Sequence, residues 1–329
     1  MIFLTGATGQ VGREVVELLA ARGTKVVALV RDPARASWLK GLEARIVMGP
    51  ITSPETWTAA RDVSAIVHCA AVITDGGSWD SYAANIRSTE LAAERARQLG
   101  VPLVHLSSVA VYGGASTEPP ATVGEEFPFR PLRDEDWYGR SKRGSEQAVW
   151  REAERGLRAI ALRPCVIYGP WDRHAFPKLL STARRGVMPL FGRGDRPMAL
   201  VHSRSVAEGV IAALDAKEGW GRSYNITGDA PIAPRDLVAA LGRGLGRRIR
   251  TPSIPAGLAL GAAGLLDRAA RLLLPDGSFP GSFKTVVGYW RGGDPYRADA
   301  ARTVLKWAPR IDHTAEIERL AREHLPLSR

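Results

Sequence analysis

The stretch "IFLTGATGQVGREVVELLAARG" (2–23) joins a short apolar run to an amphipathic run through glycines at positions 6, 9 and 12. The apolar run predicts a strand over 2–6, and the pattern after it predicts a helix over 11–23. Glycine permits a tight turn and lets the backbone approach a pyrophosphate, whose charge would face the amino terminus of the helix. The stretch therefore predicts a dinucleotide-binding loop made by Gly6, Thr8, Gly9, Gln10, Val11 and Gly12.

Short apolar runs and helical patterns continue to alternate through the first half of the chain. Further strands are predicted over 25–30, 44–49, 65–71, 102–108 and 158–164, and a further helix over 85–100. Strands that are apolar on both faces and alternate with helices indicate a parallel sheet covered on both sides. The sequence therefore predicts an α/β fold with a doubly wound parallel sheet and a ligand at the carboxyl ends of its strands.

After residue 165 the alternation becomes less regular. A Pro/Gly-rich stretch and a helix are predicted over 168–180, an extended segment over 192–202, a helix over 205–216 and a strand over 223–227. The remainder is mostly helical and loop. We predict a dinucleotide-binding domain of residues 1–167, to which 199–228 return, and a smaller substrate-binding lid of residues 168–198 and 229–329.

The composition narrows the choice of partners. The 329 residues carry a net charge of +11, but the arginines are scattered without a basic tract, which favours a solvated surface or a polyanionic small molecule over nucleic acid. Cys69 and Cys165 lie in apolar runs and suggest buried, reduced thiols, with no metal site. The opening "MIFLTGATG" has no signal-peptide pattern, so we expect a cytoplasmic protein.

The most apolar stretch, 254–275, is interrupted by Asp267, Arg268 and Arg271, and is too short a run to span a bilayer. We expect it to form a helix that buries one face in the core of the lid. The alternative is contact with a membrane surface, which the net positive charge keeps open.

The end of the second predicted strand bears on the choice of dinucleotide. An acidic residue there is typical of NAD enzymes, whereas arginine accommodates the 2′-phosphate of NADP. Arg31 follows the strand directly and Arg35 comes soon after. Asp32 could reach a ribose or cap the following helix. We predict NADP(H) in preference to NAD(H).

Tyr138 precedes Lys142 by four residues in "WYGRSKRGSEQAVW" (137–150), where a helix is predicted to begin. Positions four apart share one helix face, and a nearby ammonium lowers the pKa of a phenol from its usual value of about 10. Such a pair is also common on exposed helices. The stretch "LSSVAVYG" (106–113) adds weight, because it places a serine pair at the ligand edge, where a hydroxyl could bind the same substrate oxygen.

With these pieces in place, the chain resembles the extended short-chain dehydrogenases/reductases of the NAD-dependent epimerase/dehydratase superfamily, which have a Rossmann fold. The resemblance covers residues 1–230. Its motifs occur in the family's order: "TGATGQVG" (5–12), "VHCAA" (67–71), "LSSVAVYG", "YGRSK" (138–142), "LRPCVIYGP" (162–170) and "YNITG" (224–228).

The resemblance implies a role for each catalytic candidate. Tyr138 would exchange a proton with the substrate oxygen, and Lys142 would bind the nicotinamide ribose and lower the pKa of the tyrosine. Ser108 would orient the substrate, with Ser107 the less favoured choice. Asn85 matches an asparagine of the family, although a helix cap explains it equally well.

The resemblance also places further residues around the cofactor. Ala70 and Ala71 would lie beside it, and Pro164 and Val166 along the nicotinamide. Cys165 would lie close to that ring, although packing explains it better. A homodimer is common in the family, but no feature of the sequence demonstrates one.

The stretches 254–290 and 294–310 resemble the branch that holds the 3β-hydroxysteroid dehydrogenases and dihydroflavonol-reductase-like enzymes, in which the first forms part of the lid. We therefore predict an NADP-dependent oxidoreductase that interconverts a secondary alcohol and a ketone on a largely apolar steroid-, flavonoid- or β-keto-acid-like molecule. The alternative within the family is a nucleotide-sugar epimerase or dehydratase with tightly bound NAD(P). It is kept open by four lid arginines, Arg184, Arg185, Arg193 and Arg196. A non-catalytic, cofactor-sensing regulator is a third hypothesis, disfavoured because Tyr138 and Lys142 are both present.

Overall fold

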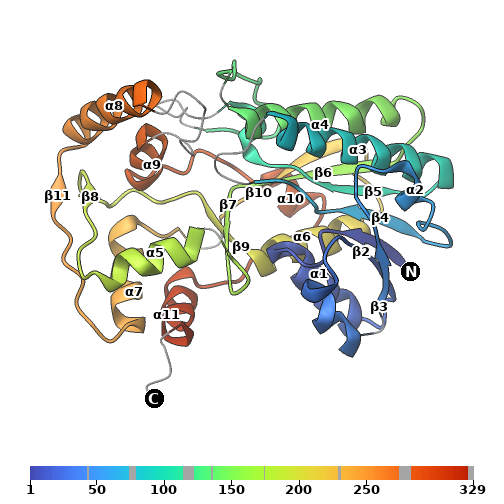
Figure 1. The fold of residues 1–329 in the computed structure, drawn as a ribbon, viewed down its shortest axis with the longest axis horizontal. Coiled ribbons are helices and arrows are strands. Elements are labelled where there is room, and N and C mark those ends of the chain that lie inside the picture. The colour runs from blue at the N-terminus through green and yellow to red at the C-terminus, as the bar shows by residue number, and fades with distance from the viewer. Residues whose placement is uncertain are drawn as a thin grey trace.

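The computed structural model of the chain describes residues 1–42, 44–73, 79–113, 122–134, 136–173, 175–228, 231–273 and 283–324. A seven-stranded sheet in the order β10-β6-β5-β4-β1-β2-β3 forms its centre, and all neighbouring strands pair in parallel (Figure 1). Its strands are β1 (Ile2–Thr5), β2 (Val26–Val30), β3 (Ala44–Met48), β4 (Ala65–His68), β5 (Leu103–Leu106), β6 (Ala159–Pro164) and β10 (Arg222–Ile226). The predicted doubly wound sheet is confirmed.

Helices cover both faces of this sheet. The helices α1 (Gln10–Ala21) and α6 (Ser203–Leu214) lie on one face, and α3 (Trp79–Leu99) and α4 (Trp137–Ala153) lie on the other (Figure 1). Val15 and Val206 belong to the core on the first face, and Leu91 and Val149 to the core on the second. Short helical segments follow the strands, namely η1 (Pro33–Gly41), α2 (Pro54–Trp57) and η2 (Val109–Tyr112).

The strand order reverses between β1 and β4. The chain proceeds from β1 outward to β2 and β3, then returns to β4 and proceeds the other way through β5 and β6. In doubly wound folds, ligands bind at the carboxyl ends of the strands on either side of such a point. The glycine turn, residues 6–9, follows β1 there.

The second half adds smaller elements around a second core. They are β7 (Val166–Tyr168), α5 (Ala175–Arg184), β8 (Leu190–Phe191), β9 (Leu200–His202), α7 (Pro234–Gly244), β11 (Ser253–Ile254), α8 (Ala256–Leu273), α9 (Phe283–Trp290), α10 (Asp299–Thr303) and α11 (His313–Glu323). Side chains of α5, α7 and α11 share one apolar cluster, and α8 packs with α9 in another. The lid boundaries stay a prediction. Residues 274–282 of the lid-like stretch lie outside the described residues, and no helix within the described ranges is long and apolar enough to cross a membrane.

Candidate active site

The glycine turn after β1 has no room for larger side chains. Gly6 has a φ of +76°, and a Cβ atom there would lie 2.7 Å from the backbone nitrogen of Ala70. A Cβ atom on Gly12 would lie 2.1 Å from the carbonyl oxygen of Gly6. Glycine is therefore required at both positions, by conformation at the first and by close approach at both. The same packing brings Ala70 beside the turn. Its predicted place beside a cofactor stays a prediction.

The opening of α1 fits the phosphates of a dinucleotide. Gly9 is exposed at the amino terminus of α1, and the side chain of Gln10 has a buried Nε2 atom without a hydrogen-bond partner among the described residues. A buried amide donor without a partner is costly unless a ligand or water satisfies it. Thr8 is half-buried beside these residues, whereas the Val11 side chain is buried in the core, so its backbone is the part that faces this edge. The donors present thus suit an anionic cofactor.

The segment after β4 is fixed by two polar residues. The Thr5 hydroxyl accepts a hydrogen bond from the backbone nitrogen of Ala70 at 3.3 Å. Asn85 accepts from the backbone nitrogen of Val72 at 2.7 Å, and its amide donates to the Val72 carbonyl and to Ser141 Oγ, both at 3.1 Å. Asn85 therefore ties the cofactor edge to α4. It is not a helix cap, because it lies inside α3.

The three predicted catalytic side chains come together at the carboxyl end of β5. Ser108 follows the strand and hydrogen-bonds the half-buried Tyr138 side chain. The Lys142 Nζ atom lies 6.0 Å from the centroid of the Tyr138 ring and donates to the Leu106 carbonyl at 2.8 Å. The α4 helix begins one residue before Tyr138, where Asp136 accepts from the Gly139 nitrogen at 3.0 Å.

The structure also separates the two serines. Ser107 is buried and donates its hydroxyl proton to Glu146, whereas Ser108 bonds Tyr138. Adjacent residues in an extended segment point in opposite directions, so only one of the pair can face the tyrosine. The arrangement agrees with the preference for Ser108.

Burial is the main cause of the pKa shifts of Tyr138 and Lys142 on α4. Burial raises the pKa of Tyr138 to about 12, while the hydrogen bond from Ser108 opposes this rise. Burial also lowers the pKa of Lys142 to about 8. The expected lowering of the tyrosine pKa by Lys142 is therefore wrong for the cofactor-free protein, because the loss of hydration of the phenolate outweighs any attraction to the ammonium. Tyr138 thus holds its proton at neutral pH.

The lysine pKa predicts that Lys142 destabilises the free protein. Lowering this pKa from 10.5 to about 8 costs the folded state on the order of 3 kcal/mol at neutral pH. The cost is present below pH 8 and fades as the pH rises toward 10.5, because in this window the unfolded chain holds the proton and the folded chain does not. We expect Lys142→Met to raise the free energy of unfolding at pH 7, and this gain to shrink by pH 10.

Urea unfolding of the cofactor-free protein at several pH values measures this gain. Lys40→Met, at an exposed lysine of η1, serves as the control and should change little at any pH. A Lys142→Met variant that is less stable than the wild type throughout this range would contradict the cost assigned to the buried ammonium.

A buried ion pair between Arg163 and Glu146 lies next to Ser107, which donates a hydrogen bond to Glu146. Arg163 on β6 contacts Glu146 through two hydrogen bonds, Nε to Oε1 at 2.9 Å and Nη2 to Oε2 at 2.6 Å. Its Nη1 atom donates to the Tyr112 hydroxyl at 2.8 Å, and that hydroxyl donates to Asn225 at 2.8 Å. Sequence reasoning missed this network. A signal was present, since Glu146 lies eight residues after Tyr138 and hence on the same face of α4.

The residues after β2 are arranged around Asp32. Its Oδ1 atom accepts from the Ala34 nitrogen at 3.0 Å, and Arg35 Nε lies 3.7 Å from its Oδ2. Asp32 therefore caps η1, the second of its two predicted roles. Arg31 and Arg35 are both exposed at this edge.

Arg13 is a further cation near the opening of α1, and sequence reasoning did not single it out. The carbon atom of its guanidinium lies 4.5 Å from the ring centroid of Trp38 on η1 and 3.3 Å from that of Trp171. Cation–π contacts of this kind join α1 to the segment that carries Arg31 and to the loop after β7. No sequence pattern could reveal the contact, because the three residues lie far apart along the chain.

Lid residues approach the end of β6, where the sequence placed the nicotinamide. Pro164 and Cys165 are buried there, whereas Val166 is 40% exposed. Tyr296 lies close enough to Cys165 to interact electrostatically with it, and its ring stacks on that of Tyr112 at 6.2 Å. The end of β6 is thus enclosed partly by the lid.

Other polar groups line the same region. Burial raises the pKa of Asp294 to about 6, and a Cβ atom on Gly228 would lie 3.8 Å from its Oδ2. Tyr289 lies near both Asp294 and Cys165. Among the other predicted residues, Ala71 is exposed after β4. Cys69 is half-buried, and burial raises the pKa of its thiol to about 12.

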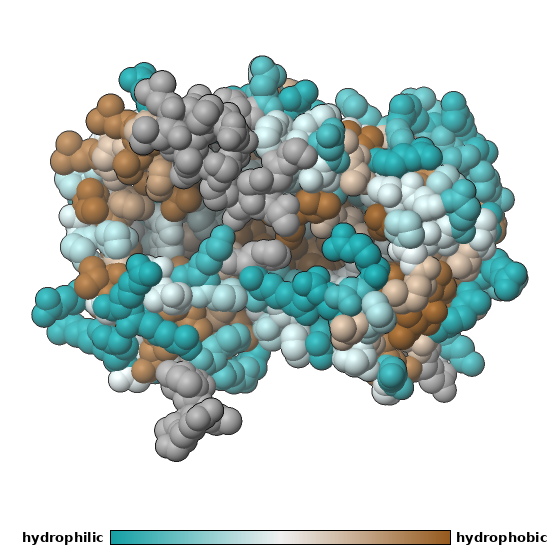
Figure 2. Space-filling view, in the orientation of Figure 1, coloured by the Kyte–Doolittle hydropathy of each residue, from teal (hydrophilic) through white to brown (hydrophobic). Residues whose placement is uncertain are grey.

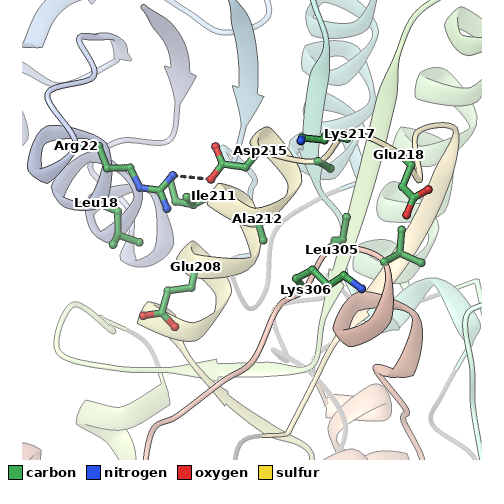
Figure 3. Close-up of a pocket in the computed structure, with 12 residues that line it drawn as sticks. Leu18, Arg22, Glu208, Ile211, Ala212, Asp215, Lys217, Glu218, Leu305 and Lys306 are labelled. Carbon is green, nitrogen blue, oxygen red and sulfur yellow. Dashed lines mark hydrogen bonds and ion pairs between the residues drawn. The ribbon is translucent and has the colours of Figure 1, made fainter.

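A cavity of about 730 Å³ lies elsewhere, between α1, α6 and residues 304–306 (Figure 3). Arg22 and Asp215 lie side by side in its lining and form an ion pair at 2.7 Å. None of the predicted site residues lines it. We therefore assign it no part in the chemistry.

Comparisons with known proteins identify the family and the fold. The model of the NAD dependent epimerase/dehydratase family matches residues 2–227. The chain is 29% identical to a 4-hydroxy-2-methyl-3-oxo-4-farnesyl-3,4-dihydroquinoline-1-oxide ketoreductase of Stigmatella aurantiaca, over 97% of this chain and 95% of that protein. It is 30% identical to a 2-alkyl-3-oxoalkanoate reductase of Shewanella oneidensis, over 82% and 73%. UDP-glucuronic acid 4-epimerase from Bacillus cereus, solved in complex with NAD, has the same fold with a TM-score of 0.76 and 18% identity, over 98% and 99%.

Proposed function

The chain belongs to the NAD-dependent epimerase/dehydratase family, and from this premise we propose that it is an NADP-dependent ketoreductase of a largely apolar substrate. The observation that carries the proposal is the cluster of Ser108, Tyr138 and Lys142 at the same sheet edge as the glycine turn. Relatives of the chain are oxidoreductases, and the cluster supplies the proton-transfer groups that such chemistry needs.

Ser108, Tyr138 and Lys142 would each have a separate role in the reduction of a ketone. A nicotinamide cofactor supplies the hydride when it is bound. Ser108 donates a hydrogen bond to the carbonyl oxygen of the substrate, and Tyr138 delivers its phenolic proton to that oxygen. Because the pKa of Tyr138 is raised to about 12, the phenol is protonated at neutral pH and so has a proton to give. Lys142 lies beside the tyrosine, with its Nζ atom 6.0 Å from the ring centroid, and would bind the nicotinamide ribose.

Two kinds of observation support an apolar substrate. Relatives that cover most of the chain are named as reductases of a farnesyl-bearing quinoline oxide and of 2-alkyl-3-oxoalkanoates, both ketones with hydrocarbon parts. The lid beside the end of β6 contributes the aromatic side chains of Tyr289 and Tyr296. Four lid arginines left a nucleotide-sugar substrate possible. One of them, Arg184, donates a hydrogen bond to the carbonyl of His324.

The direct test is an assay of NADPH consumption with water-soluble 2-alkyl-3-oxo esters, steroid ketones and nucleotide sugars. We expect freely exchanging NADPH to be consumed with the apolar ketones. Cofactor that co-purifies, is released only on denaturation and shows no net consumption would instead support the epimerase. Binding of NADPH without turnover of any of these compounds would favour the regulator.

The preference for NADP predicts an unequal effect at Arg31. The exposed guanidinium follows β2, while the neighbouring Asp32 carboxylate already caps η1 and is less free to take a ribose hydroxyl. We expect Arg31→Ala to weaken NADPH binding about tenfold or more and to change NADH binding little, because only the first carries a 2′-phosphate. Fluorescence titration measures both affinities.

Arg61→Ala is the matched control for this variant. Arg61 is exposed, but it precedes β4 and so lies at the opposite edge of the sheet. It should leave both affinities unchanged. Equal losses of NADPH and NADH affinity in Arg31→Ala would overturn the assignment of this residue to the 2′-phosphate.

A further inference from the structure

The outer face of the lid carries large apolar side chains in the open. Of twelve exposed large hydrophobic residues among those described, five lie on α8 and α9. Their exposed fractions are 70% for Leu258, 66% for Leu265, 51% for Leu266, 37% for Phe283 and 54% for Val286. Figure 2 shows apolar surface gathered over α8. We call this set the lid patch.

The inward face of α8 carries Ala259 and Ala263, beside which the half-buried Leu260 packs against the same cluster. Ala259, Ala263 and Asp267 are four residues apart and buried, and the two alanines pack against Val287 of α9. Leu258 and Leu265 lie on the opposite side. Burying a leucine stabilises a fold by about 2 kcal/mol, so a helix selected only for the lid core would turn its leucines inward. The expectation that this stretch serves the lid core is therefore incomplete, and the exposed face needs its own explanation.

The exposed charges among the described residues of α8 and α9 are of one sign. Arg268 and Lys284 are exposed beside the lid patch, and Arg291 follows α9. The only acidic residue of α8 and α9, Asp267, is turned inward, where it accepts a hydrogen bond from the Phe283 nitrogen at 2.7 Å. Among the described residues of α8 and α9, the surface offers apolar groups together with cations and no outward carboxylate. A partner that matches this surface has an apolar interior and an anionic surface. A bilayer of anionic lipids has both.

We propose that the lid patch docks the protein onto the surface of an anionic lipid bilayer. Leu258, Leu265 and Val286 enter the boundary between headgroups and acyl chains, and Arg268 and Lys284 contact the lipid phosphates. A second copy of the chain fits less well, because it would bring the same cations together on a protein whose net charge is +11. Docking would set the lid against the phase into which an apolar ketone partitions, but the inference does not depend on the proposed reaction.

Co-sedimentation with vesicles tests docking without substrate or cofactor. The probes are vesicles of phosphatidylcholine alone and vesicles with about 30% phosphatidylglycerol, at low and high salt. We expect the protein to sediment with the anionic vesicles and to be released by salt. Leu258→Gln/Leu265→Gln and Arg268→Glu/Lys284→Glu should each weaken binding about tenfold or more.

The control variants make the same types of substitution at other positions on the surface. Met48→Gln removes an exposed apolar side chain from β3, and Lys217→Glu reverses an exposed charge after α6. Both should bind vesicles like the wild type. Thermal unfolding of each variant verifies that it folds, and any variant that does not is replaced by its single substitutions.

Two results would overturn docking. One is a wild-type protein that stays in the supernatant with anionic vesicles at low salt. The other is a concentration-dependent dimer that the lid-patch substitutions abolish, which would assign the patch to a second copy. Vesicle binding by a protein that reduces no ketone would leave docking intact and count against the proposed function alone.

Discussion

Replacing Tyr138 by phenylalanine is expected to lower kcat for ketone reduction by about 10²- to 10⁴-fold, the usual contribution of a general acid. The substitution removes one hydroxyl group and keeps the ring. Ser108 remains able to hold the carbonyl oxygen, but the phenylalanine ring has no proton to deliver to it. KM and NADPH affinity should change much less, because the ring and Lys142 remain. Steady-state kinetics at saturating substrate measures the loss.

Tyr224→Phe is the control for this variant. Tyr224 is a buried phenol on β10 whose hydroxyl donates to the Gly219 carbonyl at 2.7 Å, before the strand begins and away from the ligand edge. Its loss should cost stability of about 1 kcal/mol and leave kcat unchanged. A Tyr138→Phe enzyme that turns over within tenfold of the wild type would mean that another group donates the proton.

Breaking the buried ion pair behind the serines should have the largest effect on stability. Glu146 and Arg163 are almost fully buried, with side-chain exposures of 2% and 6%. Glu146→Met leaves the Arg163 guanidinium without its carboxylate in a medium that hydrates it poorly. We expect the free energy of unfolding to fall by about 3–5 kcal/mol, as for other buried pairs that lose one partner. Urea unfolding measures it.

The double variant Glu146→Met/Arg163→Met separates two contributions to the loss of stability: the loss of the ion pair and the burial of an unpaired Arg163 guanidinium. It removes both ions, so we expect it to recover about 2 kcal/mol or more of the loss. Asp215→Asn is the control at an exposed pair, because Asp215 meets Arg22 at a similar distance, 2.7 Å, with both side chains about half exposed. That change should cost less than about 1 kcal/mol. A Glu146→Met loss no larger than the control's would refute the energetic role of the buried pair.

Local patterns were sufficient for the sheet. Each apolar run predicted as a strand, from 2–6 to 223–227, became a strand of the sheet. The five strands β1, β2, β4, β5 and β6 are buried along their whole length, which a parallel sheet covered on both faces allows. The glycine spacing and the interval from Tyr138 to Lys142 carry the same kind of information, since a turn and a helix face depend on residues close in sequence. Ser108 could be placed because the end of a strand fixes where its next residues lie.

The contacts that complete the site depend on residues distant in sequence. Arg163 meets Glu146 across the sheet, Arg13 lies against Trp171, and Tyr296 approaches Cys165 from the lid. No short-range pattern encodes these meetings, because packing of whole elements decides them.

The pKa of Tyr138 and the exposed surface of α8 were likewise decided by the packing of whole elements. The spacing of Tyr138 and Lys142 predicted attraction between them, but the depth at which folding buries the phenol decides the sign of its pKa shift. The apolar stretch 254–275 predicted a helix, but only its packing decided that Ala259 and Ala263 are buried while Leu258 and Leu265 are exposed. The sequence by itself determined the elements and their order, through interactions over a few residues. Tertiary structure alone decided hydration, since exposure to water is a property of the assembled surface.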